Sequence, residues 1–149
     1  MKYLEVKKEG FITWVYINRP ESMNALSVEV LQELTAFNKK LKEDLDSRVI
    51  IYTGKGDNFS AGADLKEKRE SKSYLELWRN NFGKPAIESM LNVDQITIAA
   101  VNGYCLGGAA CIASACDFRI ADTNSKLGYP EIDLGLLPAI HFNHLPKIV

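Results

Sequence analysis

The chain has 149 residues, of which 46% are hydrophobic and 25% charged, the ordinary composition of a globular protein of one domain. Eighteen basic residues against nineteen acidic ones give a net charge of −1, and no basic stripe with interleaved aromatic residues occurs. Nucleic acid is therefore not an expected partner. We expect residues 1–149 to form one core domain.

The cysteines predict a reducing compartment. Cys105, Cys111 and Cys116 lie in one apolar stretch, without CxxC spacing or a histidine close by, so neither a disulfide framework nor a metal site is predicted. We expect buried thiols and a cytoplasmic protein, with an organelle reached by import as the alternative. The charged first ten residues do not resemble a signal peptide, and the uncharged stretch 96–116 contains Asn102 and three glycines, which favours a buried strand and helix over a membrane span.

The first half of the chain predicts a hairpin and then a helix. Residues 3–6 and 11–17 are strand-like around Glu9-Gly10, and a break follows at 18–21. Ser27 is a predicted N-cap. Behind it, apolar residues at helical spacing form the expected buried stripe: Val28, Leu31, Leu34, Phe37, Leu41 and Leu45.

The second half predicts strands that alternate with helices, which is typical of an α/β sheet with crossover connections. Expected strands are 49–53, 96–101, 117–121 and 126–128. The charged run 66–72 is expected to be solvated, and Gly83-Lys84-Pro85 to interrupt or kink a helical pattern over 74–91. The chain ends within an apolar helical pattern without a C-cap signal, so we expect a domain that is incomplete at its C-terminal end.

Two small-residue turns between a strand and a helix indicate a site. One is NFSAGADLKE at 58–67, and the other lies within AVNGYCLGGAACIASACDFRIAD at 100–122. Each alone is a plain turn with close packing. Together they could present two backbone N–H donors to one oxygen, the layout of an oxyanion hole.

Glu131 is the candidate acid or base, because its neighbours in LGYPEIDLGLLP are mostly apolar or small, although a surface glutamate is an equal alternative from this segment alone. Asp133 is expected to have a structural role. His141 and His144 would share one helix face, but two histidines are too few for a metal site. A nucleophilic Cys111 lacks a nearby base, and Ser60 lacks a GxSxG context.

Four segments resemble, in order and spacing, the crotonase family of enoyl-CoA hydratases and isomerases: NRPESMNALS, NFSAGADLKE, AVNGYCLGGAACIASACDFRIAD and LGYPEIDLGLLP. The resemblance implies the β–β–α spiral of the ClpP/crotonase fold. It also implies acyl-CoA thioester substrates, with coenzyme A as part of the substrate and no other cofactor. Assembly as a homotrimer or hexamer is implied where the family's C-terminal helices exist.

The resemblance also implies roles for individual residues. Ala63 and Gly108 match the positions whose N–H groups hold the thioester oxygen, and Glu131 matches a glutamate that transfers protons. The segments that wrap the nucleotide end of coenzyme A are matched by Ala25, Ala61, Asp64 and Leu65.

Three departures from the family pattern bear on the reaction. Cys111 replaces a second glutamate, which puts two-carboxylate hydration in doubt and leaves isomerisation with one base open. Bulky residues at 138–144 replace a glycine-rich loop, and the family's C-terminal helical region is absent from this chain. We expect an acyl-CoA enzyme that performs isomerisation or hydration. The alternatives are a CoA-thioester-binding or assembly protein without catalysis, and a hydrolase that uses Cys111 as its nucleophile.

Overall fold

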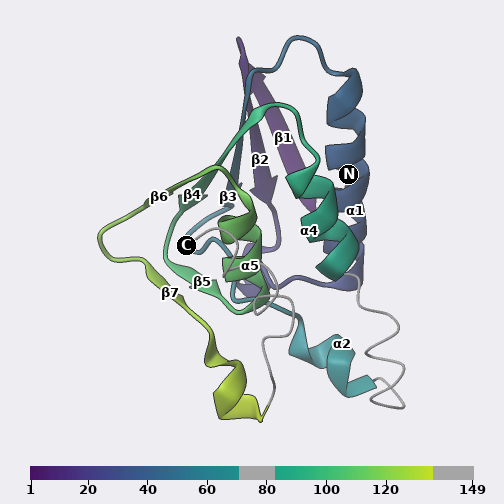
Figure 1. The fold of residues 1–149 in the computed structure, drawn as a ribbon. Coiled ribbons are helices and arrows are strands. Elements are labelled where there is room, and N and C mark those ends of the chain that lie inside the picture. The colour runs from purple at the N-terminus through teal and green to yellow at the C-terminus, as the bar shows by residue number, and fades with distance from the viewer. Residues whose placement is uncertain (71–82, 136–149) are drawn as a thin grey trace.

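The computed structural model describes residues 1–70 and 83–135, which form an α/β structure around one mixed sheet (Figure 1). The sheet has the order β1-β2-β3-β4-β6, in which β1 is antiparallel to β2 and the other neighbours are parallel. Its strands are β1 (Leu4–Glu9), β2 (Ile12–Ile17), β3 (Val49–Gly54), β4 (Ile96–Val101) and β6 (Phe118–Ala121). Two further strands, β5 (Tyr104–Leu106) and β7 (Lys126–Gly128), form a small parallel sheet.

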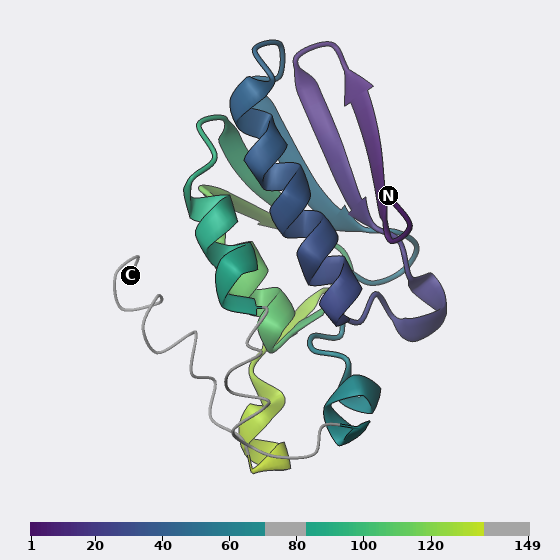
Figure 2. The ribbon, with the colours of Figure 1, turned by 90° about the vertical axis from the view of Figure 1, so that its right-hand side faces the viewer.

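Three α-helices of the described residues cover one face of the large sheet (Figure 2). They are α1 (Val28–Lys40), α4 (Gly83–Leu91) and α5 (Gly108–Ala115), while α2 (Leu65–Glu70) lies beyond the end of the sheet. The core lies between these helices and alternate strand residues such as Val15, Ile50 and Ala99, which are at most 1% exposed. Alternation along each strand produces this one-sided burial. On β6, in contrast, Phe118 and Ile120 are exposed.

The predicted hairpin and helix start are confirmed. β1 pairs with β2 around Gly10, and the Ser27 hydroxyl accepts a hydrogen bond of 3.3 Å from the Val30 N–H. The predicted buried stripe is only partly correct, because Val28 and Leu31 are half-buried and Leu45 is 88% exposed. The helix ends before this residue, at Lys40, and a short 3₁₀ turn (Leu41–Glu43) leads the chain away from the helix axis.

The helical pattern over 74–91 is only partly described. Gly83, Lys84 and Pro85 form the first turn of α4, where a proline is tolerated because the N–H groups of a first turn have no intrahelical acceptor. Residues 74–82 lie outside the described residues, so the predicted interruption of the helical pattern stays a prediction. In the part of the chain that is described, no helix is long and apolar enough to cross a membrane.

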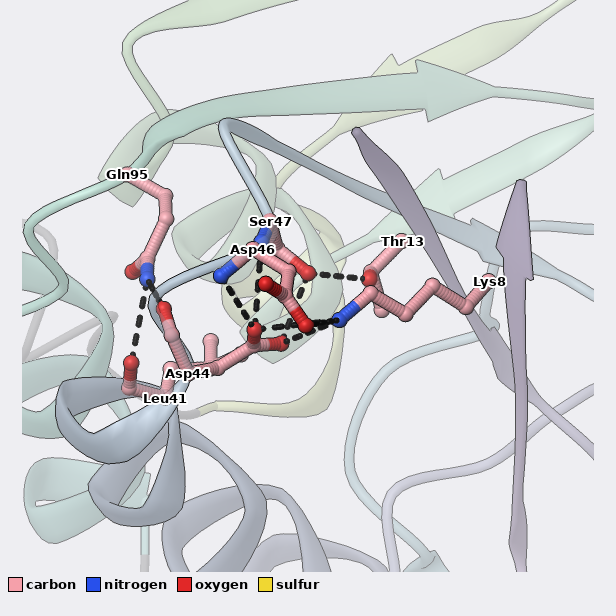
Figure 3. A network of polar contacts seen from close by, with 7 residues as sticks. All are labelled: Lys8, Thr13, Leu41, Asp44, Asp46, Ser47 and Gln95. Carbon is pink, nitrogen blue, oxygen red and sulfur yellow. Dashed lines mark hydrogen bonds and ion pairs between the residues drawn. The ribbon is translucent and has the colours of Figure 1, made fainter. Parts of the chain in front are cut away.

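A polar network ties the connection between α1 and β3 to the neighbouring strands (Figure 3). The Asp44 carboxylate accepts hydrogen bonds from the Ser47 hydroxyl at 2.7 Å, from the Ser47 N–H at 3.1 Å and from Lys8 of β1 at 3.1 Å. The Ser47 hydroxyl also lies 2.7 Å from that of Thr13 on β2. The Gln95 amide donates to the carbonyls of Leu41 and Asp44, both at 3.0 Å.

This network marks the amino ends of the parallel strands. Their carboxyl ends lie at the opposite edge, where β3 ends at Gly54 and β4 at Val101. Open α/β sheets carry their ligand sites at the carboxyl edge, because the loops that leave neighbouring parallel strands meet there. The two predicted small-residue turns follow these two strands.

Candidate active site

The turn after β3 and the turn before α5 lie against each other. The Ser60 N–H donates to the Tyr104 carbonyl at 2.9 Å, and the Leu106 N–H donates to the Ser60 carbonyl at 3.1 Å. A β-carbon placed on Gly108 would lie 3.9 Å from the Ala63 nitrogen. The structure thus brings together the two residues that the sequence singled out as oxyanion donors.

The N–H groups of Ala63 and Gly108 are available as donors. The residues on both sides of Ala63 form backbone hydrogen bonds with Leu26. The Leu26 N–H donates to the Gly62 carbonyl at 2.8 Å, and the Asp64 N–H donates to the Leu26 carbonyl at 3.1 Å. In such a parallel bridge the N–H of the intervening residue points away from the partner strand. Gly108 is the first residue of α5, where N–H groups have no intrahelical acceptor. Within residues 1–70 and 83–135 neither N–H has an acceptor.

Glu131 lies at this same place, on a 3₁₀ turn (Pro130–Leu134). A β-carbon on Gly107 would lie 2.8 Å from Glu131 Oε1, so the carboxylate packs directly on this glycine. The other oxygen, Oε2, is buried and accepts no hydrogen bond from the described residues. A buried carboxylate oxygen without a partner is rare and needs a functional or structural explanation. Asp133, in the same turn, is exposed.

Cys111 lies one helical turn beyond Gly107, and its N–H donates to the Gly107 carbonyl at 3.2 Å. Burial, and after it the negative charge of Glu131, raises the pKa of the Cys111 thiol to about 11. The pKa of Tyr129 is also raised, by burial and by the charges of Cys111, Cys105 and Glu131. The thiol, the phenol and the carboxyl therefore interact electrostatically. Since a protonated thiol is a poor nucleophile at neutral pH, the raised pKa disfavours a hydrolase that works through Cys111.

All three cysteines are buried thiols, as predicted. His141 and His144, together with the bulky segment 138–144, lie outside the described residues.

The four residues matched to coenzyme A contacts lie along adjoining segments. The Ala61 N–H donates to the Met23 carbonyl at 2.9 Å. Arg19 connects the same two segments, because its Nη1 donates to the Ala25 carbonyl at 2.7 Å and lies 3.1 Å from Asp64 Oδ2. Leu65 begins α2 and is 41% exposed.

The ion pair between Arg19 and Asp64 is largely shielded from solvent, with side chains 15% and 11% exposed. Burial acts to raise the pKa of the Asp64 carboxyl, but the hydrogen bonds from Arg19 and from the Lys66 N–H outweigh it and hold this pKa below its ordinary value. Sequence reasoning gave Arg19 no role, although it belongs to the NRPESMNALS segment, because nothing near it in the chain indicated its partner.

Comparison with known proteins gives consistent matches. The family model described as enoyl-CoA hydratase/isomerase matches residues 7–149. The chain is 37% identical over 134 residues to a short-chain-enoyl-CoA hydratase of Clostridium acetobutylicum, covering 89% of this chain and 51% of that protein. It is 36% identical over 146 residues to a crotonyl-CoA hydratase of Syntrophomonas wolfei, covering 97% and 56% of the two chains.

The solved structures agree. A crystal structure of an enoyl-CoA hydratase from Bacillus anthracis superimposes with a TM-score of 0.91 at 32% identity, over 97% of this chain and 57% of that one. The expected crotonase-like fold is thereby confirmed, and the chain spans about half the length of the relatives it matches. With its sequence and its fold in agreement, the chain belongs to the enoyl-CoA hydratase/isomerase family.

Proposed function

We propose that the protein binds an acyl-CoA thioester and stabilises its enolate with the N–H groups of Ala63 and Gly108. The observation that carries the proposal is their convergence, with 3.9 Å between the Ala63 nitrogen and a β-carbon placed on Gly108. Removal of an α-proton moves negative charge onto the thioester oxygen, and one such donor is typically worth about 2.7–4 kcal/mol in the transition state. The N-terminus of α5, which begins at Gly108, adds the positive end of its dipole.

Glu131 is the proposed proton-transfer residue. Its carboxylate packs on Gly107, the neighbour of the donor Gly108, and its Oε2 accepts no hydrogen bond from the described residues. An acid or base must lie within hydrogen-bond reach of the proton that it moves. A thioester held by the two N–H groups would place its α-carbon beside this carboxylate.

The coenzyme A moiety is proposed to lie along Ala25, Ala61, Asp64 and Leu65. In support, Arg19 and the backbone bonds of Ala61 hold these residues in adjoining segments. The relatives named above are, by name, hydratases of enoyl-CoA substrates, which agrees with a CoA thioester as ligand.

The reaction that we propose is isomerisation or hydration of an enoyl-CoA, with the single-base version favoured. Cys111 occupies the position where the resemblance implies a second glutamate, and its thiol has a pKa of about 11. A protonated thiol does not activate water as a carboxylate does. One carboxylate suffices to move a proton between two carbons of the same substrate.

The test is deuterium uptake at the α-carbon of a short acyl-CoA in heavy water, with Glu131→Gln as the matched variant. Uptake that vanishes in the variant supports an enolate enzyme with Glu131 as its base. Absence of uptake in the unaltered protein, with CoA still bound in a calorimetric titration, would instead support the CoA-binding or assembly protein. Equal uptake in both proteins would remove Glu131 from the mechanism. Assembly as a homotrimer or hexamer is a separate proposal, which light scattering tests.

A further inference from the structure

The segment 54–58 lies between β3 and the first donor turn, and the side chain of Asn102 forms hydrogen bonds with it. Asn102 directly follows β4, and its Nδ2 donates to the Gly56 carbonyl at 2.7 Å and the Gly54 carbonyl at 3.2 Å. Its Oδ1 accepts from the Gly54 N–H at 3.3 Å. The Asn102 carbonyl accepts from the Phe59 N–H at 2.6 Å.

Asn24 also forms hydrogen bonds with this segment. Its side chain is fully buried, and its Nδ2 donates to the carbonyls of Lys55 at 2.9 Å and Asn58 at 2.6 Å. Its Oδ1 accepts from the Arg19 N–H at 2.8 Å. Asn24 has a φ of +56°, a left-handed conformation that non-glycine residues adopt at a cost, so the surrounding contacts must stabilise it.

Beyond these two asparagines, the backbones themselves are in contact. A β-carbon on Gly103 would lie 2.1 Å from the Asp57 carbonyl oxygen, and one on Gly54 would lie 1.8 Å from the Asn58 carbonyl oxygen. A side chain on Gly103 would therefore not fit between the segment after β4 and the segment 54–58, and a side chain on Gly54 would not fit within the turn that follows β3. From Asn58 the chain continues to Ala63, and from Gly103 it continues to Gly108.

On the basis of the proposed function, we infer that Asn102 and Asn24 are positioning residues that set the relation between the N–H donors of Ala63 and Gly108. Asn102 ties the exit of β4, which leads to Gly108, to the exit of β3, which leads to Ala63. Asn24 ties that same exit to the loop whose Leu26 pairs with Ala63. A group displaced by about 1 Å from its working geometry can cost about 100-fold in rate.

Asn102→Asp tests the inference, because it preserves shape and replaces the Nδ2 donor by an oxygen that repels the carbonyls of Gly54 and Gly56. The probe is cinnamoyl-CoA, a conjugated thioester whose ultraviolet absorption moves to longer wavelength when donors polarise its carbonyl. We expect the bound probe to lose most of this shift in the variant. The kcat for α-proton exchange should fall about 10- to 100-fold and the KM change far less. Asn102→Ser removes the Nδ2 amide donor without adding a charge, and it serves the same test should the aspartate variant not fold.

The matched control is Asn38→Asp. Asn38 is buried, more deeply than the half-buried Asn102, and its Nδ2 donates to the Ser89 hydroxyl at 3.0 Å while its Oδ1 accepts from the Tyr52 hydroxyl at 2.7 Å. The Asn38→Asp variant should have a lower melting temperature and should keep the absorption shift of the bound probe. If the Asn102 variants lower the melting temperature but keep the full shift and kcat, the positioning role is wrong and the asparagine is only structural. If the unaltered protein binds the probe without any shift, the proposed oxyanion hole itself is wrong, and the inference fails with it.

Discussion

The carboxylate of Glu131 lies against the α-carbon of Gly107, where a β-carbon would come within 2.8 Å of Oε1. Gly107 has φ +53° and ψ −118°, a conformation that is open to glycine and strained for other residues. This glycine is therefore required twice, once by the backbone turn that leads into α5 and once by the glutamate that packs on it.

Gly107→Ala should disturb the proposed site more than it disturbs folding. The added methyl group displaces the Glu131 carboxylate, and we expect α-proton exchange to fall at least about tenfold. Gly10→Ala is the matched control, because Gly10 also has a positive φ, of +59°, but has open space around it. Both variants should lose stability, measured by thermal unfolding, and only the first should lose exchange. An unchanged exchange rate in Gly107→Ala would contradict the proposed placement of Glu131.

The buried thiols should resist alkylation in the folded protein. Cys111 is 6% exposed with a pKa of about 11, so little thiolate is present at pH 8. Mass spectrometry after iodoacetamide treatment should show almost no labelling of Cys105, Cys111 or Cys116 until urea unfolds the chain. Rapid labelling of Cys111 alone, with loss of activity, would instead support a hydrolase that uses Cys111 as its nucleophile.

Asp44→Asn should lower stability at neutral pH by about 1–3 kcal/mol, because the carboxylate accepts hydrogen bonds from Ser47 and from Lys8. Asp46→Asn is the control. It removes the same charge from the same loop, but Asp46 is 84% exposed and contacts Lys8 only at 3.4 Å, so we expect an effect within about 0.5 kcal/mol. Urea unfolding measures both values, and similar effects of the two substitutions would contradict the network.

The same residue predicts a pH dependence. Hydrogen bonds from the hydroxyl and the N–H of Ser47, and after them from Lys8, hold the pKa of Asp44 well below its ordinary value. A depressed pKa in the folded state contributes stability above the unfolded pKa of about 3.9, and this contribution is lost as pH falls below it. The difference in unfolding free energy between the unaltered protein and Asp44→Asn should therefore shrink as the pH is lowered from 5 toward 2. A constant difference would argue against the carboxylate as its source.

Arg19 and Asp64 should be energetically coupled, since they form a shielded ion pair at 3.1 Å. Removing one partner leaves the other charge poorly solvated, so Arg19→Met and Asp64→Asn should each cost about 1–3 kcal/mol. The double variant should cost clearly less than the sum, as measured by urea unfolding of all four proteins. Strict additivity would show that the pair contributes nothing as a pair.

Much of this protein follows from local sequence. The hairpin around Gly10, the helix start at Ser27 and the buried cysteines were predictable, because periodicity, capping and an uncharged run act among neighbours in the chain. The two donor turns were visible for the same reason, as small residues placed between a strand and a helix. Four ordered segments also indicate the family, because each is a local pattern.

The way these pieces meet depends on contacts between distant parts of the chain. The contact of Glu131 with Gly107, the pairing of Arg19 with Asp64 and the bonds of Asn102 to the segment 54–58 each join residues far apart in the chain. The exposure of Leu45 likewise depends on where the chain turns away from the helix, at Leu41–Glu43. Such contacts depend on the paths of several strands at once, and no spacing within one segment encodes them. The sequence indicates which chemical groups the proposed site contains, and their mutual positions depend on the sheet, whose parallel strands end together at one edge.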